Sequence, residues 1–131
     1  MRRVLSIAVV AGLVAGCGAD AATPYTAKAT APCLRDAGFA VSTADRDVGV
    51  IAASAARGGL HARVKGNDLI VAFGRDAREA LDLARGYRRF APKKVRKHLR
   101  DILSRQRNAI LVWTVAPTQL QLQTVQKCLA S

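Results

Sequence analysis

The amino-acid sequence predicts one α+β domain built on an antiparallel sheet of three to four strands. The 131 residues are 50% apolar, which is enough for a compact core. Residues 60–73 alternate between apolar and polar side chains, as a β-hairpin does. From residue 39 to residue 115 the expected elements follow as strand, helix, strand, strand, helix, strand. This is the split β-α-β-β-α-β (ferredoxin-like) order, here with extra terminal helices and one disulfide.

The central hairpin is the best-specified element. Gly66 and Asn67 predict a two-residue type II′ turn, because Gly at the first central position adopts a positive φ easily. This turn would place Lys65 opposite Asp68 and would bring apolar pairs together on one face. The expected apolar pairs are Val64 with Leu69, Ala62 with Val71, and Leu60 with Phe73. The other face would carry His61, Arg63 and Lys65.

The first residues are typical of a secretion signal. Arg2 and Arg3 precede an apolar run, residues 4–15, which Gly16 and Cys17 follow. The run is shorter than the roughly 20 residues that a membrane-spanning helix needs. We therefore expect a cleaved signal and not a transmembrane anchor.

The end of this signal segment indicates how it is cleaved. Residues 14–17 (VAGC) resemble the lipobox of bacterial lipoproteins, in which small residues precede a Cys that is lipidated and becomes the mature N-terminus. The resemblance covers the signal only, and it implies a signal peptide over residues 1–17 and a lipid anchor on Cys17. Residues 19–21 (ADA) offer the alternative of ordinary cleavage after Ala21, which would release a soluble secreted protein. Both alternatives imply export.

The first half of the mature chain is expected to begin with a tether. Residues 18–30 are small and polar, and a single domain would follow over residues 31–131. Thr30 is suited to cap a helix of about two turns that contains Cys33. Residues 39–43 predict a short strand, without which the sheet would have three strands. Asp47 is expected to cap the next helix.

The second half carries stronger signals. Asp76 and Glu79 form a capping-box pattern that predicts a helix ending near Phe90. Residues 93–105 predict a basic amphipathic helix whose apolar side packs on the domain. Residues 109–115 are apolar at nearly every position, as in a strand covered on both faces, which the terminal helices could provide.

The cysteines predict a disulfide. Lipidation or cleavage removes Cys17 from the thiol count and leaves Cys33 and Cys128, which should pair outside the cytosol. In the chain-entropy model such a bridge contributes roughly 4 to 5 kcal/mol for a loop of about 100 residues.

Catalytic and cofactor motifs are not found in the sequence. It has no P-loop, G-x-G-x-x-G, G-x-S-x-G or H-E-x-x-H pattern. His61 and His98 are the only imidazoles, and neither has a recognisable supporting motif. We therefore expect no enzyme, no cofactor and no metal site.

Positive charge is the remaining functional signal. The net charge is +12, and residues 85–107 contain ten basic residues and a single acidic one, Asp101. So one-sided a run is either a solvated face or a contact for an anionic partner. We call these ten residues the basic segment: Arg85, Arg88, Arg89, Lys93, Lys94, Arg96, Lys97, Arg100, Arg105 and Arg107.

Two functional hypotheses follow. Export argues against nucleic acid as a partner and leaves anionic lipid, an anionic envelope polymer or an acidic protein. The first hypothesis is a non-catalytic envelope domain, lipid-anchored at the cell membrane, whose basic segment contacts such a surface or partner. The alternative is a small-ligand or inhibitor-like protein-binding module that uses the open sheet face around His61, Arg63 and Lys65.

Overall fold

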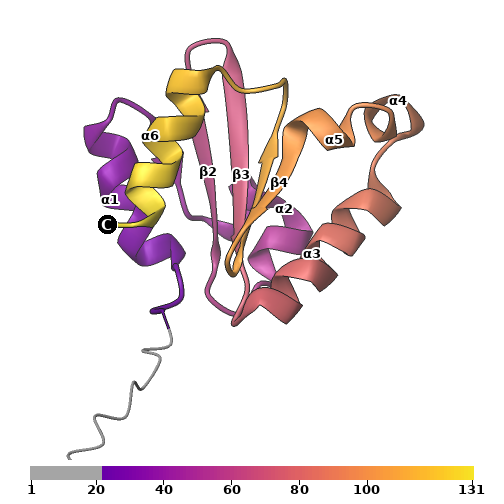
Figure 1. The fold of residues 1–131 in the computed structure, drawn as a ribbon, viewed down its shortest axis with the longest axis horizontal. Helices are drawn as coiled ribbons and strands as arrows, with labels where there is room; N and C mark the ends of the chain where they lie inside the picture. The colour runs from indigo at the N-terminus through magenta and orange to yellow at the C-terminus, as the bar shows by residue number, and fades with distance from the viewer. Residues whose placement is uncertain (1–21) are drawn as a thin grey trace, which may run out of the picture.

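A computed structural model describes residues 22–131 and shows a five-stranded antiparallel sheet with helices on both faces (Figure 1). The order of strands in the sheet is β1-β2-β3-β5-β4. Along the chain, the predicted strand and helix order is present with one further strand, β4, inserted before the last. The ferredoxin-like arrangement of these strands is not confirmed, because β1, β2 and β3 are neighbours in the sheet in their chain order. The strands are β1 (Ala40–Ser42), β2 (Gly59–Val64), β3 (Asn67–Phe73), β4 (Leu103–Gln106) and β5 (Ala109–Trp113).

The hairpin of β2 and β3 keeps its predicted faces but has a different turn. Lys65 and Gly66 form the loop, and Gly66 has the positive φ (75°) at the second loop position. Val64 therefore pairs with Asn67, two positions away from the predicted register. Because side chains alternate with a period of two, this shift leaves each residue that stays in the strands on its predicted face.

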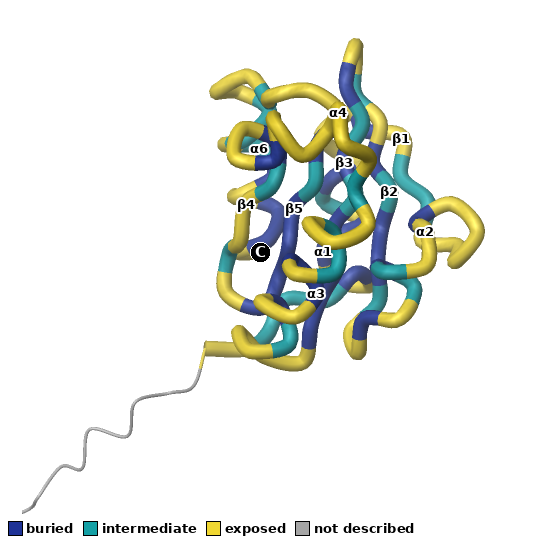
Figure 2. Tube along the Cα trace, turned by 90° about the vertical axis from the view of Figure 1, so that its right-hand side faces the viewer, coloured by how far each residue is buried: buried dark blue, intermediate teal, exposed yellow. Residues whose placement is uncertain are grey.

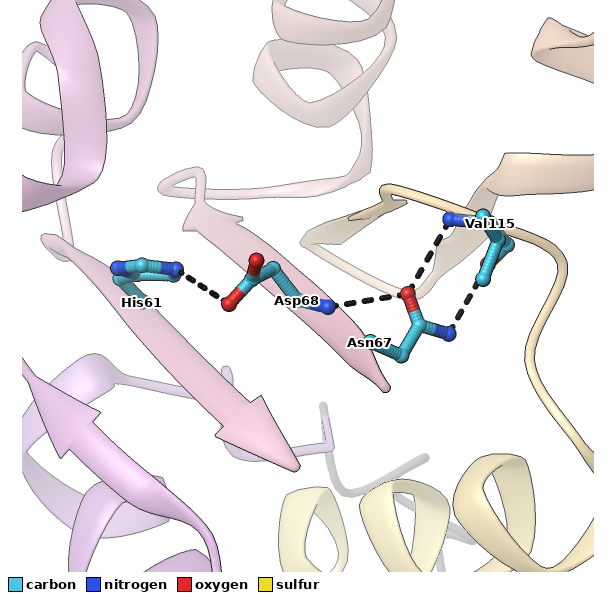
Figure 3. Close-up of polar contacts among 4 residues, drawn as sticks. All are labelled: His61, Asn67, Asp68 and Val115. Atoms are coloured by element: carbon cyan, nitrogen blue, oxygen red, sulfur yellow. Dashed lines mark hydrogen bonds and ion pairs between the residues drawn. The ribbon is translucent and has the colours of Figure 1, made fainter. Parts of the chain in front are cut away.

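Asn67 explains the change of register. Its side chain is buried and lies between the hairpin and the segment after β5 (Figure 3). Its Oδ1 accepts from the backbone N–H of Val115 at 3.1 Å, and its Nδ2 donates to the Val115 carbonyl at 3.0 Å. These bonds hold Asn67 in the strand, so Gly66 moves to the second loop position and Lys65 leaves the strand face.

The first helix begins earlier than the sequence predicted. Helix α1 (Ala27–Asp36) is capped by Thr26, whose side chain accepts from the N–H of Ala29 at 3.1 Å. Thr30, the predicted cap, is buried within the helix. Residues 27–30 therefore belong to the domain and not to the tether, while residues 18–21 and Cys17 lie outside the described residues.

The second helix, α2 (Asp45–Ala53), is interrupted at Gly49. Gly49 has φ 80° and ψ 163°, a conformation that splits the helix into two short parts. The predicted Asp47 cap is wrong: the helix starts after Ala44, and the Asp47 carboxylate instead accepts from the Ser42 hydroxyl at 2.5 Å. The kink exposes Val50 and leaves Val48 and Ala52 buried.

Helix α3 (Ala77–Phe90) has its predicted bounds. The Asp76 side chain accepts from the Glu79 N–H at 2.9 Å, which is half of the predicted capping box. The Glu79 carboxylate instead accepts from the N–H groups of Arg75 and Ala56, and so ties the loop after α2 to the start of α3.

The predicted helix over residues 93–105 is wrong. The chain forms two single turns, α4 (Lys93–Arg96) and α5 (Leu99–Ile102), followed by strand β4. β4 pairs antiparallel with β5, from Leu103 opposite Val112 to Gln106 opposite Ala109. Pairing along the otherwise open edge of β5 satisfies backbone groups that a continuous helix would have left exposed, which outweighs the local helical pattern.

Helices cover the sheet on both faces, as the uniformly apolar last strand predicted. Ile110 packs with α2 and α3, whereas Leu111 and Trp113 pack on the opposite face with α1 and α6 (Gln119–Leu129). Figure 2 shows β5 buried between these layers. The Thr118 side chain caps the last helix and so fixes where this cover begins.

The predicted disulfide is confirmed. Cys33 of α1 is bonded to Cys128 of α6, with a Cα–Cα distance of 5.4 Å and a sequence separation of 95. The two helices lie side by side on one face of the sheet (Figure 1). The bridge therefore closes almost the whole domain into one loop.

Candidate functional site

The basic segment extends over four elements of one side of the molecule. Arg85, Arg88 and Arg89 lie on α3, and the three lysines with Arg96 and Arg100 lie on and between α4 and α5. Arg105 is on β4 and Arg107 in the turn after it, beyond the end of β4 that is far from α4 (Figure 1). All ten side chains belong to exposed residues. The dense part of the segment is thus residues 88–100.

Few of these charges are compensated. Within residues 22–131, Arg85 is the only member with an ion pair, to Asp82 at 2.7 Å. Arg96 donates its Nε–H to the Ala91 carbonyl at 2.9 Å, which leaves the guanidinium charge uncompensated. Arg107 stacks on the Tyr25 ring at 5.0 Å, so it helps to hold the N-terminal end of the domain. The remaining charges face solvent.

The apolar residues of this region mostly pack inward, as expected. Leu99 and Ile102 are buried against the face of the sheet that α1 and α6 cover, and Leu103 is half-buried. Val95 is exposed and lines an apolar groove of about 450 Å³ between α4, α5 and the segment after β5. Lys94 and His98 lie at this groove, so His98 is part of the basic surface.

The alternative ligand face is brought together only in part. His61 and Arg63 line an open pocket of about 450 Å³ beside β1, together with Ser42, Arg46 and Asp47. Lys65 is in the hairpin loop and does not line the pocket. The pocket combines two guanidinium groups with a carboxylate, which suits a small polar or anionic ligand.

The polar contacts in this pocket do not form a nucleophilic arrangement. His61 Nε2 lies 3.2 Å from Asp68 Oδ1 (Figure 3). Ser42 is directly opposite His61 in the sheet register, yet its hydroxyl donates to Asp47. A nucleophilic Ser would need a hydrogen bond to the imidazole, and the described contacts contain none.

Sequence reasoning missed several of these residues. Ser42, Arg46 and Asp68 join His61 only because β1 pairs with β2 and the hairpin register is shifted by two. It also missed Val50 and Phe90, which are among the most exposed large apolar side chains in the described residues. Their signal was present: Val50 falls outside the apolar stripe of its helix, and Phe90 directly follows two arginines.

Metal sites and membrane-spanning helices are two further features that could indicate a function. Among residues 22–131, no group of three or more His, Cys, Asp or Glu side chains could hold a metal ion. None of the described helices is both long and apolar enough to span a membrane. Comparisons with family models, with curated proteins and with solved structures found no match for this chain. The surface of this chain is therefore the remaining guide to its function.

Proposed function

We propose that this protein is an exported, lipid-anchored, non-catalytic envelope protein whose basic segment contacts an anionic membrane surface. The observation that carries the proposal is the uncompensated charge of the segment, with one ion pair for ten exposed cations in the described part of the chain. Such a surface repels itself, and a nearby array of anionic headgroups would offset the repulsion. An anionic envelope polymer is the closest competing partner.

The dense part of the segment is large enough to bind measurably. Each Lys or Arg close to an anionic membrane contributes on the order of 1 kcal/mol. Five such residues would together contribute on the order of 5 kcal/mol, which exceeds the thermal energy RT several-fold. The attraction is screened within about 10 Å at 0.1 M salt, so binding must weaken steeply as salt rises.

The proposed anchor would keep the domain close to the membrane. Tyr25 is fixed to the domain, because its backbone N–H and carbonyl bond the Asn108 side chain at 2.9 and 2.8 Å. Residues 18–24 are then the only link from Cys17, and seven extended residues span at most about 25 Å. A second acyl chain makes such an anchor stable where one chain is marginal.

The lysines of this chain allow a charge-matched test. Of the lysines, three lie in the basic segment and three lie elsewhere. We would bind unanchored protein carrying Cys17→Ala to vesicles of anionic or neutral lipid, at low and high salt. The segment variant is Lys93→Glu, Lys94→Glu and Lys97→Glu; the control variant is Lys28→Glu, Lys65→Glu and Lys127→Glu.

The two variants have the same net charge, so only position distinguishes them. We expect the segment variant to lose at least about 3 kcal/mol of binding, a factor above 100, and the control variant to lose much less. Equal losses would mean that net charge alone drives binding. Binding no stronger to anionic than to neutral vesicles would contradict the membrane proposal, and selective binding to an anionic polymer would replace it.

The anchor has its own test. Wild-type protein expressed with its signal should partition into the detergent phase, and Cys17→Ala should be secreted yet partition into the aqueous phase. Wild-type protein in the aqueous phase, with an N-terminus at residue 22, would support cleavage after Ala21 instead.

The pocket at His61 supports the second candidate function, binding of a small anionic ligand. Arg46 and Arg63 converge there with the imidazole, and Lys65 lies nearby in the loop. A ligand bound there should survive high salt and be lost on Arg63→Ala, whereas the segment variant above should still bind it. Insensitivity to Arg63→Ala would exclude this pocket.

A further inference from the structure

An exposed apolar patch adjoins the start of the dense part of the basic segment, where Arg88 and Arg89 precede Phe90 at the end of α3. Val50 is 87% exposed and Phe90 is 73% exposed. Together with Val48, Gly49, Ile51 and Tyr87 they line one open apolar cavity of about 390 Å³ between α2 and the end of α3. We call these six residues the apolar patch. Large apolar side chains exposed together on a soluble domain commonly mark a contact surface.

The backbone directs the side chains of Val50 and Phe90 towards solvent. Gly49 interrupts α2, so Val48 is buried while Val50, two residues later, projects to solvent. Phe90 is the last residue of α3, and Ala91 continues with an extended backbone. Neither residue is needed to fill the core, which Val48, Ala52, Leu83 and their neighbours already form.

Cations border the patch. Arg88 and Arg89 directly precede Phe90, and the Arg89 guanidinium lies 5.7 Å from the centre of the Phe90 ring. Arg46 at the start of α2 is also exposed, but it lines the pocket at His61 and lies 3.9 Å from Asp47. Lys93 and Lys94 follow Phe90 after a short link. Asp45 and Asp47 are the acidic groups in the first turn of α2.

We propose that Val50 and Phe90 enter the interfacial region of an anionic bilayer while the neighbouring cations contact its headgroups. This inference rests on the proposed function and adds an orientation, with the α2/α3 face towards the membrane. Apolar side chains surrounded by cations are the arrangement with which peripheral proteins combine insertion and charge attraction. A second copy is a poor occupant, because two such patches in contact would bring Arg88 and Arg89 of both copies together.

The first experiment separates insertion from charge attraction. Val50→Ser with Phe90→Ser removes the patch and keeps every charge, and Leu120→Ser is a control because Leu120 is 72% exposed on α6 of the opposite face. Burying one such side chain is worth about a tenfold change in affinity or more. On anionic vesicles we expect the double variant to bind at least tenfold more weakly. Any binding of the wild type that persists at high salt, where charge attraction is screened, should be absent in the double variant. The control should bind as the wild type does.

Equal binding by the double variant and the wild type would overturn the inference while leaving the proposed function intact. If the wild type does not bind vesicles at all, both the inference and the proposed function are overturned. A dimer in solution that the double variant dissociates would show that a second copy occupies the patch, and would also overturn the inference.

The second experiment reports insertion directly. Phe90→Trp places an indole in the patch, while the native Trp113 is 2% exposed and should not respond. We expect the added fluorescence to shift to the blue on anionic vesicles and to be quenched by lipids brominated on their acyl chains. Binding without a shift or quenching would mean that charge alone holds the protein, which overturns the inference and leaves the function standing.

Discussion

The helices that cover the two faces of the sheet are held in place by different means. On the α1/α6 face, a disulfide joins the helices, and the buried Asn108 side chain bonds Tyr25 and Gly74. On the α2/α3 face, contact depends on small side chains: a Cβ placed on Gly59 would lie 2.7 Å from Ala52 Cβ. The α2/α3 face also holds the kink at Gly49 and the apolar patch.

The difference indicates a division of tasks between the faces. The α1/α6 face holds the disulfide and the buried Asn108 hydrogen bonds, so a substitution that removes either link should destabilise the protein most. On the α2/α3 face, the helices pack tightly against the sheet, and their solvent-facing side carries exposed apolar and basic side chains. These exposed side chains can serve binding at little cost to folding. Stability measurements on matched variants can test this division.

The largest expected effect is loss of the disulfide. Cys33→Ala with Cys128→Ala should lower the free energy of unfolding by about 2 to 5 kcal/mol, because the unfolded chain is no longer closed into a long loop. Denaturant unfolding with and without reductant measures it: reductant should lower the stability of the wild type only. Peptide mapping without reduction should recover the Cys33–Cys128 peptide. Two free thiols in the exported protein would contradict the bond.

The second effect concerns the polar link on the same face. Asn108→Ala should cost about 2 to 3 kcal/mol, since the backbone groups of Tyr25 and Gly74 would lose their buried partner. Because this bond fixes the N-terminal segment, protease access near residue 25 should rise as well. Gln123→Ala, at an exposed position of α6, is the control and should change neither. A cost below about 0.5 kcal/mol would mean that the Asn108 hydrogen bonds do not stabilise the α1/α6 face.

The sequence predicted this division only in part. The disulfide followed from the thiol count, and the two-sided cover followed from the nearly continuous apolar pattern of residues 109–115. The roles of Asn67 and Asn108 could not be predicted, because their partners, Val115 and Tyr25, are 48 and 83 residues away. Local patterns hold no record of such contacts.

Strand β4 and the candidate sites show the same limit. Residues 93–105 have a helical apolar period, and tertiary pairing with β5 overrode it at residue 103. The ten basic residues were found by counting, since exposed charge needs no tertiary information. The pocket at His61 needed the strand register, and the patch needed the Gly49 kink, so neither could be assembled from spacing alone.

A pair of glycines on the α2/α3 face gives opposite predictions. Gly49→Ala should destabilise by about 1 to 3 kcal/mol, because its φ of 80° and ψ of 163° belong to a region that is nearly exclusive to glycine. Gly86 lies within α3, where a Cβ would meet Ile51 Cδ1 at an ordinary 3.7 Å, so Gly86→Ala should stabilise by about 0.5 to 1 kcal/mol. Urea unfolding compares them, and changes of the same sign would contradict the kinked backbone.

The smallest effect at neutral pH is expected at Tyr87, and it separates the two faces by chemistry. The Tyr87 hydroxyl is buried in the α2/α3 face with no hydrogen-bond partner among the described residues. Burial raises its pKa from the ordinary 10.0 to about 12. Between these two values the unfolded chain has released this proton and the folded protein still holds it. The stability of the wild type should therefore be unaffected by this group below pH 10 and should fall as pH rises from 10 to 12.

Tyr87→Phe removes both the unpartnered hydroxyl and its ionisation. At pH 8 the variant should be as stable as the wild type or more stable by up to about 1 kcal/mol, which is the opposite sign to Asn108→Ala on the other face. The advantage of Tyr87→Phe should widen between pH 10 and 11, measured as the difference between the two urea midpoints at each pH, so that titrations common to both proteins cancel. Midpoint curves that stay parallel over this range would mean that the hydroxyl reaches solvent in the folded protein. Destabilisation at pH 8 would mean that the α2/α3 face, like the α1/α6 face, depends on a buried polar link.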